Sequence, residues 1–578
     1  MPSARRVALT LGLGVSLLAS LAPSRSEAGE PPLVTALRTE MARAQTKLRL
    51  RGYEAPYFLA YAIRELENFE MVGRFGALQR KDHNRSRAAY VEVRVGDYQL
   101  DNSGDPSDST MDPDDVDGYE PGTEVSLDES ADAIRGTLWL LTDMKYKRAL
   151  SAFAKKRGKR ANSLIEDEDL PSFSREKPVT AIAPARSLDR DEEALADLVR
   201  AASGRFRDYA NVFDANVRVD GERVRRTMLT SEGTLVVTER VIYGLHLVAG
   251  SRAKDGTLVE QQRDFYGHAP SDLPNKEVLL AAVDRMAKEL AGLERAPVID
   301  PYNGPAILME EAAGVFFHET LGHRLEGERQ NDQRDGRTFR GQIGKRVLPE
   351  FLTIVDDPTQ RVAGTQPLNG YYTHDDEGVP ARGVKLVDKG VLRDFIKSRT
   401  PIAGSPHSNG HGRSEATARP MSRMGNLFVR SDKRVSISEL KRLLLEEVRK
   451  QGKPFGLIIT DIAGGSTNTS NYGYQAFKGQ PRLVYRVDAK TGEETLVRGV
   501  EMVGTPLTSV SRIVATSDTE GVFNGYCGAE SGYVPVATIA PAVLMTEIEL
   551  QRAQKPKERP PILPAPWGPE LQSKPAAR

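Results

Sequence analysis

Two histidines and a glutamate stand close together in the segment His318-Glu319-Thr320-Leu321-Gly322-His323. Five of the eight histidines in the chain fall between residues 318 and 411, so imidazole groups are concentrated in this part of the sequence. Two neutral imidazoles can hold a zinc ion, and a neighbouring carboxylate can take a proton from the water that zinc acidifies. The segment therefore predicts a hydrolytic metal site with His318 and His323 as ligands and Glu319 as general base.

The spacing of the two histidines constrains the backbone that carries them. On a regular α-helix, residues five apart point about 140° away from each other, whereas the four-residue spacing of many zinc sites leaves about 40° between them. A π-bulge would bring both rings to one side of the helix, and Gly322 tolerates such a distortion. We therefore expect an irregular helix if the two histidines bind one ion. The spacing alone leaves open that they are unrelated.

The single cysteine, Cys527, is the candidate for a third ligand, because a catalytic zinc usually has three protein ligands and one open position. Gly525 and Gly528 flank it and allow the backbone to approach closely. Two other interpretations stay open, namely a small buried hydrophobic residue and a nucleophile paired with a histidine. A lone cysteine also excludes an intrachain disulfide.

These residues resemble the HExxxH signature of the TldD/PmbA family of metallopeptidases, and further matching segments follow in the same order. They are Asp375–Gly378, Gly383–Leu392, Ser408–Arg413, Pro420–Ser422, Cys527-Gly528, Val534–Val536 and Ala540-Pro541. The resemblance implies a zinc ion bound by His318, His323 and Cys527, with Glu319 as general base. It also implies a dimer with an enclosed active site, in which the catalytic type carries the motif and its PmbA-like partner does not. Ala529 departs from the family pattern, in which we expect a lysine.

Other polar residues near the motif each have a functional and a structural interpretation. His411 and Arg413 lie in a glycine-rich loop and could stabilise an oxyanion, or they could only pack the loop. Glu326 could hydrogen-bond an imidazole of the site, or it could be a surface residue. The acidic residues that follow His374 could bind metal, although a solvated turn is the simpler interpretation. The run 464–468 lacks the lysine and helix start of a phosphate loop.

Composition bounds the remaining possibilities. The chain has 578 residues, with 80 Lys and Arg balanced by 80 Asp and Glu, so it has no global basic field for nucleic acid. Residues 1–28 read as a cleavable signal peptide: Arg5 and Arg6 precede an apolar run, and Ser26 and Ala28 suit a cleavage site. This predicts an exported protein, periplasmic or extracellular, without a stable membrane anchor.

The chain around the motif alternates between helical and strand-like patterns. Helices are expected at 32–51, 134–156, 191–202, 275–293, 309–326 and 436–451, and strands at 57–78, 88–98, 235–241 and 246–252. Residues 101–132 carry twelve acidic residues and no Lys or Arg, which predicts a solvated insertion.

We predict an α+β fold. Its N-terminal sections, a domain at 30–188 with the acidic insertion and a central domain at 189–297, have mixed or antiparallel sheet. A strand-rich C-terminal domain at 298–550 carries the metal-binding helix, and a disordered Pro-rich tail occupies 555–578.

Together these features predict a zinc-dependent endopeptidase with one zinc per chain that hydrolyses extended or unfolded peptides. The assembly would be a homodimer, or a heterodimer with a PmbA-like subunit. The alternative is a non-enzymatic envelope scaffold or PmbA-like partner subunit with a structural zinc. Glu319 discriminates between them, because a structural site has no use for a base and usually fills all four positions with protein ligands.

Overall fold

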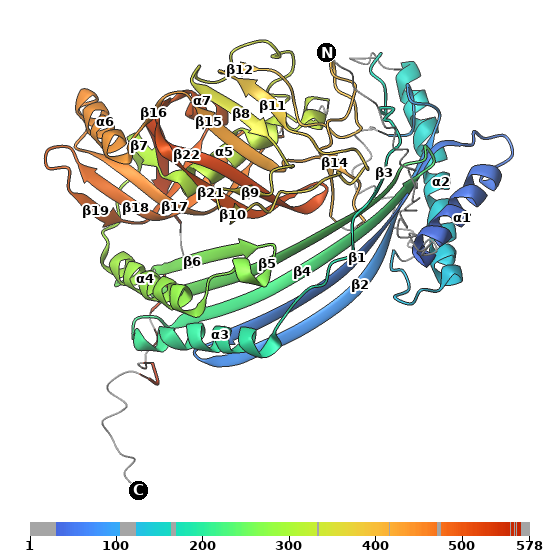
Figure 1. Ribbon diagram of the computed structural model, residues 1–578. Coiled ribbons are helices and arrows are strands. Elements are labelled where there is room, and N and C mark those ends of the chain that lie inside the picture. Colours follow the sequence, from blue (N-terminus) through green and yellow to red (C-terminus); the bar gives the residue numbers. More distant parts are fainter. Residues whose placement is uncertain are drawn as a thin grey trace, which may run out of the picture.

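The computed structural model describes residues 31–103, 123–162, 169–331, 335–415, 417–470, 475–554, 557–559, 561, 563 and 565–567. The predicted signal peptide, most of the acidic insertion and most of the Pro-rich tail lie outside these residues. The described chain has two large sheets, two small two-stranded hairpins and seven α-helices, which confirms the α+β prediction (Figure 1). None of the helices in these ranges is both long and apolar enough to cross a membrane.

The first sheet has six strands in the order β2-β1-β4-β5-β3, with β6 paired to β5. All neighbours are antiparallel except β3 and β5, so the sheet is mixed. Its strands are β1 (Pro56–Arg74), β2 (Ala77–Val95), β3 (Thr180–Ile182), β4 (Asp214–Thr230), β5 (Leu235–Arg252) and β6 (Leu258–Gly267). Strands from both sides of the predicted boundary at 188/189 pair here, so this boundary does not separate two sheets.

Four helices cover one face of the first sheet, and the other face looks toward the C-terminal domain (Figure 1). The helices are α1 (Pro32–Lys47), α2 (Ala131–Asn162), α3 (Glu192–Arg205) and α4 (Lys276–Arg295). The side chains of Asp191 and Asn275 cap α3 and α4 by accepting backbone N–H bonds. The polar pattern of the sequence therefore located both helix starts within one residue.

Two predictions about the first sheet need correction. The run 57–78 is not one bent strand, because Phe75 and Gly76 adopt positive φ and turn β1 into β2. The two strands predicted at 235–241 and 246–252 are one strand, β5. Gly244 within this strand provides space, since a Cβ there would lie 2.5 Å from His246 Nε2.

A buried histidine joins three strands of the first sheet. His246 on β5 contacts Asp220 through Nε2 at 3.0 Å and Asp264 through Nδ1 at 2.6 Å. Burial lowers the pKa of His246, but the hydrogen bonds to the two aspartates outweigh it and raise the pKa to about 9.

The C-terminal sheet has twelve strands, and part of it closes on itself. Strand β22 pairs with β20 and with β7, and the path β20-β18-β17-β7 completes the circuit. The strands are β7 (Tyr302–Leu308), β8 (Leu352–Asp356), β11 (Val384–Asp388), β12 (Val391–Leu392), β15 (Asn426–Ser431), β16 (Arg434–Val435), β17 (Phe455–Thr467), β18 (Phe477–Asp488), β19 (Glu494–Val497), β20 (Val500–Gly504), β21 (Ile513–Ala529) and β22 (Gly532–Arg552). Two small hairpins, β9 (Val362–Ala363) with β10 (Gln366–Pro367) and β13 (Gly412–Arg413) with β14 (Met421–Ser422), lie outside it.

Helix α5 (Glu310–Thr320) packs on β22, β17 and β21, and residues 312–320 are all buried. Helix α6 (Ile437–Lys450) packs in a separate apolar cluster with β7, β17 and β22, and the short helix α7 (Pro506–Ser511) precedes β21. The largest apolar core of the chain therefore surrounds α5, which carries the predicted motif.

The start of the predicted disordered tail is ordered. Thr257 and Lys557 form an antiparallel bridge, and Glu558 N donates to Gly256 O at 3.0 Å. Arg252 also pairs with Glu558. These contacts attach the chain just after β22 to the turn between β5 and β6, which a proline-rich composition did not reveal.

Candidate metal centre

The two motif histidines come together because the α-helix ends between them. Helix α5 stops at Thr320, and Leu321, with φ −121° and ψ −48°, leaves the helical conformation. A short 3-10 helix over Gly322–Leu325 then carries His323. The predicted irregularity is confirmed, but it is a helix break and not a π-bulge.

Gly322 has a different role from the predicted one. Its φ is not positive, so the residue is not needed for backbone freedom. A Cβ at this position would lie 2.1 Å from Met424 Sδ. Glycine is therefore required because the turn between the histidines packs directly against Met424.

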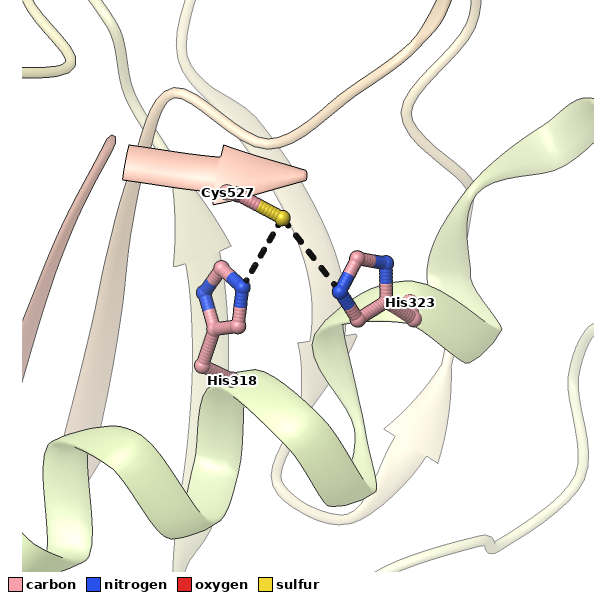
Figure 2. Close-up of side chains that lie close together, drawn as sticks. All are labelled: His318, His323 and Cys527. Atoms are coloured by element: carbon pink, nitrogen blue, oxygen red, sulfur yellow. Dashed lines mark hydrogen bonds between the residues drawn. The ribbon is translucent and has the colours of Figure 1, made fainter. Parts of the chain in front are cut away.

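Cys527 on β21 completes the cluster (Figure 2). Its Sγ lies 3.2 Å from His318 Nε2 and 3.3 Å from His323 Nε2. The three ligand atoms lie within 4.8 Å of one another, and all three residues are buried. No other group of three or more His, Cys, Asp or Glu side chains with this geometry occurs in the part of the chain that the structure describes.

The cluster fits a zinc ion. Tetrahedral coordination with Zn–S near 2.3 Å and Zn–N near 2.0 Å separates nitrogen from sulfur by about 3.5 Å, a few tenths of an ångström more than the observed distances. Burial raises the pKa of Cys527, but the two histidines outweigh it and lower the pKa well below the usual range. They thus favour the thiolate, which is the form that binds metal.

Glu319 lies beside the cluster with an unpaired carboxylate. Its side chain is 9% exposed and makes no hydrogen bond or ion pair with the residues described. It packs against Gly465 of β17, where a Cβ would lie 2.4 Å from Glu319 Cγ. A carboxylate that is next to a ligand and free of partners can accept a proton.

Glu326 holds His323 from the side opposite Cys527. Both of its carboxylate oxygens lie 3.2 Å from His323 Nδ1, and Oε2 accepts from Arg329 Nε at 2.7 Å. Burial raises the pKa of Glu326, but His323 and the arginines outweigh it and lower the pKa to about 2. The structure thus places Glu326 where the imidazole-partner interpretation requires it.

Arg423 was missed by sequence reasoning. Its Nη2 donates to the carbonyl of Cys527, and its Nε lies 3.7 Å from Glu326 Oε1. It therefore contacts the backbone of one candidate ligand and the carboxylate that orients another. Only its position directly after the matched segment Pro420–Ser422 pointed toward it.

His411 and Arg413 are not part of the cluster. His411 is fully buried, with Nε2 3.2 Å from Asp356 Oδ1. Arg413 donates to the backbone carbonyls of Met424 and Pro535. These contacts fit the loop-packing interpretation, and an oxyanion role stays a prediction.

The acidic residues after His374 do not form a solvated turn. Asp375 is buried and accepts backbone N–H bonds from Glu377, Val379 and Gly412. Glu377 is also buried and accepts from Arg399 N. Both carboxylates therefore fix the backbone of neighbouring loops by accepting N–H bonds.

Comparison with known proteins identifies relatives of this region. Residues 301–552 match the PmbA/TldA metallopeptidase C-terminal domain. A metalloprotease from Archaeoglobus fulgidus is 31% identical over 272 residues, which cover 46% of this chain and 58% of the relative. A zinc metalloprotease TldD homolog from Saccharolobus solfataricus is 24% identical over 369 residues, which cover 62% of this chain and 76% of the relative.

The similarity in structure extends further than the similarity in sequence. TldE from Thermococcus kodakarensis aligns with a TM-score of 0.58 and 15% identity, over 89% of this chain and 100% of that chain. At this identity the likeness concerns the fold alone. By sequence, the chain spans about three fifths of the length of curated relatives such as the Archaeoglobus protein.

Proposed function

We propose that the chain, whose residues 301–552 match the PmbA/TldA metallopeptidase C-terminal domain, is a TldD/PmbA-type zinc-dependent endopeptidase acting on extended or unfolded peptides. The observation that carries the proposal is the convergence of His318, His323 and Cys527 beside the free carboxylate of Glu319. Relatives named metalloproteases support a metal-dependent hydrolase as the general class.

His318, His323 and Cys527 would hold the ion. When bound, zinc supplies Lewis acidity that polarises a peptide carbonyl and acidifies water. Glu319 takes the proton of the attacking water on a carboxylate oxygen and delivers it to the departing amide nitrogen. The apolar side chains around α5 exclude bulk water and thereby strengthen these electrostatic interactions.

A structural zinc, as in a scaffold or PmbA-like partner, is the second candidate. Structural sites usually have four protein ligands, whereas only three converge here among the described residues. A carboxylate without a partner also has no purpose in a closed site. Both observations favour the catalytic proposal.

Strand β21 offers a way to bind an extended peptide. Beyond its short pairing with β16 at residues 516–517, it pairs only with β22 among the described strands. One edge of the segment that holds Cys527 is therefore available, and a substrate could add there through main-chain hydrogen bonds. This mode gives low side-chain selectivity and requires an unfolded segment.

Assembly and location complete the proposal. The enzyme is exported through residues 1–28 and works as a homodimer, or as a heterodimer with a PmbA-like subunit. N-terminal sequencing of the mature protein and light scattering test these two points. A mature chain that begins at Met1 in the cytoplasm, or a monomer with full activity, contradicts them.

The decisive variant is Glu319→Gln. The purified protein should contain one zinc per chain and cleave unfolded casein, and a chelator should abolish cleavage. Glu319→Gln should keep zinc and lose cleavage, because the amide cannot accept the proton. Wild-type activity in this variant refutes the base assignment, and zinc without cleavage of any peptide in a broad library favours the structural role.

A further inference from the structure

A second cavity lies on the other face of β21, away from the metal centre. It has a volume of about 550 Å³ and is enclosed by the first sheet on one side and the β21–β22 hairpin on the other. Tyr526 and Tyr533 line it from the hairpin. Because successive side chains of a strand point to opposite faces, Tyr526 faces this cavity while Cys527 faces the histidines.

Three arginines of the first sheet line the same cavity. Arg64 on β1 lies directly opposite Arg226 on β4, and Arg240 on β5 lies opposite Val224, two residues along the same face. Like charges placed directly across a pair of strands destabilise a sheet. An arrangement that costs stability in the free chain needs another reason for its presence.

The positive charge of this cluster is only partly neutralised. Arg226 is 6% exposed and pairs with Asp376 at 2.7 Å, yet its Nε and Nη2 are buried without a partner. Arg240 pairs with Glu222 at 2.8 Å, and its Nε is also unpartnered. Unsatisfied guanidinium N–H groups at a cavity wall are donors that a ligand could complete.

Arg64 differs from Arg226 and Arg240 because no acidic side chain in the described part of the chain forms an ion pair with it. It makes no hydrogen bond or ion pair with any residue in the described ranges. Burial, followed by the neighbouring Arg240, lowers its pKa from the usual value. Glu222, Glu415 and Asp376 act on Arg64 through space in the opposite direction, and the cavity lining as a whole has six arginines and five acidic residues, an excess of one positive charge.

The cavity is connected to the strand that would receive a substrate. Tyr526, next to Cys527, donates a hydrogen bond to Glu222 at 3.2 Å, and Glu222 pairs with Arg240. A peptide added to the edge of β21 presents alternate side chains to the two faces of the sheet. One set points toward the metal centre, and the other set points toward the arginines.

We propose that this arginine cluster binds carboxylate side chains of the peptide substrate, so that the enzyme prefers acidic residues at alternate positions flanking the cleaved bond. The inference rests on the proposed function and names the substrate class for it. Arg64, Arg226 and Arg240 donate to the carboxylates, which complete the unpartnered N–H groups, and the two tyrosines pack against the substrate's aliphatic stems.

The test uses the full-length mature protein carrying Glu319→Gln, so that binding is measured without cleavage. The probes are two fluorescein-labelled ten-residue peptides, one with Glu and one with Gln at alternate positions, followed by fluorescence anisotropy. A charge-assisted hydrogen bond in a buried site predicts about tenfold or tighter binding of the Glu peptide. Arg64→Gln should remove this difference.

Arg64→Gln is a safe variant because it breaks no contact and relieves the repulsion with Arg226, so Tm should stay unchanged or rise. Arg218→Gln is the matched control. It removes the same charge from the same face of β4, eight residues from Arg226, and does not line the cavity. It should keep the preference for the Glu peptide.

Equal affinities for the two peptides in the parent protein, or a difference that survives Arg64→Gln, overturn the inference. A third outcome also overturns the inference: inorganic phosphate displaces the Glu peptide, and the protein binds the Glu and Gln peptides equally well. This outcome would assign the arginine cluster to free anions. The proposed function is tested separately by hydrolysis of the Gln peptide by the wild-type enzyme. Hydrolysis without acidic preference refutes only the inference, and acidic preference without hydrolysis refutes only the function.

Discussion

Replacing Gly465 by alanine should displace the catalytic base while leaving the metal ligands untouched. Gly465 lies on β17, and an added Cβ would stand 2.4 Å from Cγ of Glu319 and 3.0 Å from Cδ. Ordinary contact begins at 3.4 Å, so the Glu319 side chain must move by about 1 Å. The nearest atom is Cγ and not the carboxylate tip, so a simple rotation of the end group does not relieve the clash.

The expected effect is a loss of rate without a loss of metal. A misplacement of 1 Å in a catalytic group costs about 10²-fold in kcat, equivalent to roughly 3 kcal/mol of transition-state stabilisation. Steady-state cleavage of a fluorogenic peptide gives kcat, and elemental analysis gives zinc per chain. Zinc should remain at the wild-type level, because neither the histidines nor Cys527 contact Gly465.

Gly464→Ala is the matched control. Gly464 precedes Gly465 in the same strand, its φ is not positive, and a Cβ there meets no atom within 4 Å. This variant should keep kcat within about twofold, since alanine is no worse than glycine in a strand. Equal activity of the two variants, or loss of zinc in Gly465→Ala, refutes the assignment of Glu319 and Gly465.

Three further predictions concern the residues around and beyond the ligands. Glu326→Gln should weaken zinc binding by about 10–100-fold, because the charge that orients His323 is removed; competition with a chromophoric chelator measures this, and unchanged affinity contradicts it. His246 has a folded pKa of about 9 against an ordinary 6.5, so it stabilises the fold below about pH 6.5 and loses this contribution as pH rises through 9. Urea unfolding should show that the free energy of unfolding falls by about 3 kcal/mol between pH 6.5 and pH 9 in the wild type and not in His246→Gln. The same fall in the variant refutes the assignment. Iodoacetamide should label Cys527 slowly in the zinc-loaded protein and quickly after chelation, as read by mass spectrometry, whereas fast labelling that inactivates the loaded protein indicates a nucleophile.

Local patterns predicted the helices well because their signals lie within a few residues. The predicted helices at 275–293 and 436–451 begin at Asn275 and Ser436, which the structure shows as the caps of α4 and α6. The irregular backbone between the motif histidines also follows from the spacing, since a regular helix cannot bring both rings to one ion. The kind of irregularity did not follow from the spacing, and neither did the need for glycine at 322, which comes from packing against Met424 about a hundred residues later.

Features set by distant contacts were not predictable in this way. In the first half of β2, the run from Gln79 to Ser86 is polar and exposed, so it lacks the alternation that marks the second half. Its strand conformation comes from pairing with β1. In the same way, nothing near Arg423 indicates that it contacts the carbonyl of Cys527, because only the folded C-terminal domain brings these segments together.

The central claim is that His318, His323 and Cys527 bind one zinc ion with a position left open for chemistry. X-ray absorption at the zinc edge of the purified mature protein tests it directly. We predict one zinc per chain, with one sulfur at about 2.3 Å and the remaining nitrogen or oxygen ligands at about 2.0–2.1 Å. Cys527→Ser should abolish the sulfur shell together with zinc retention. A zinc ion without a sulfur ligand, or stoichiometric zinc in Cys527→Ser after dialysis, contradicts the account.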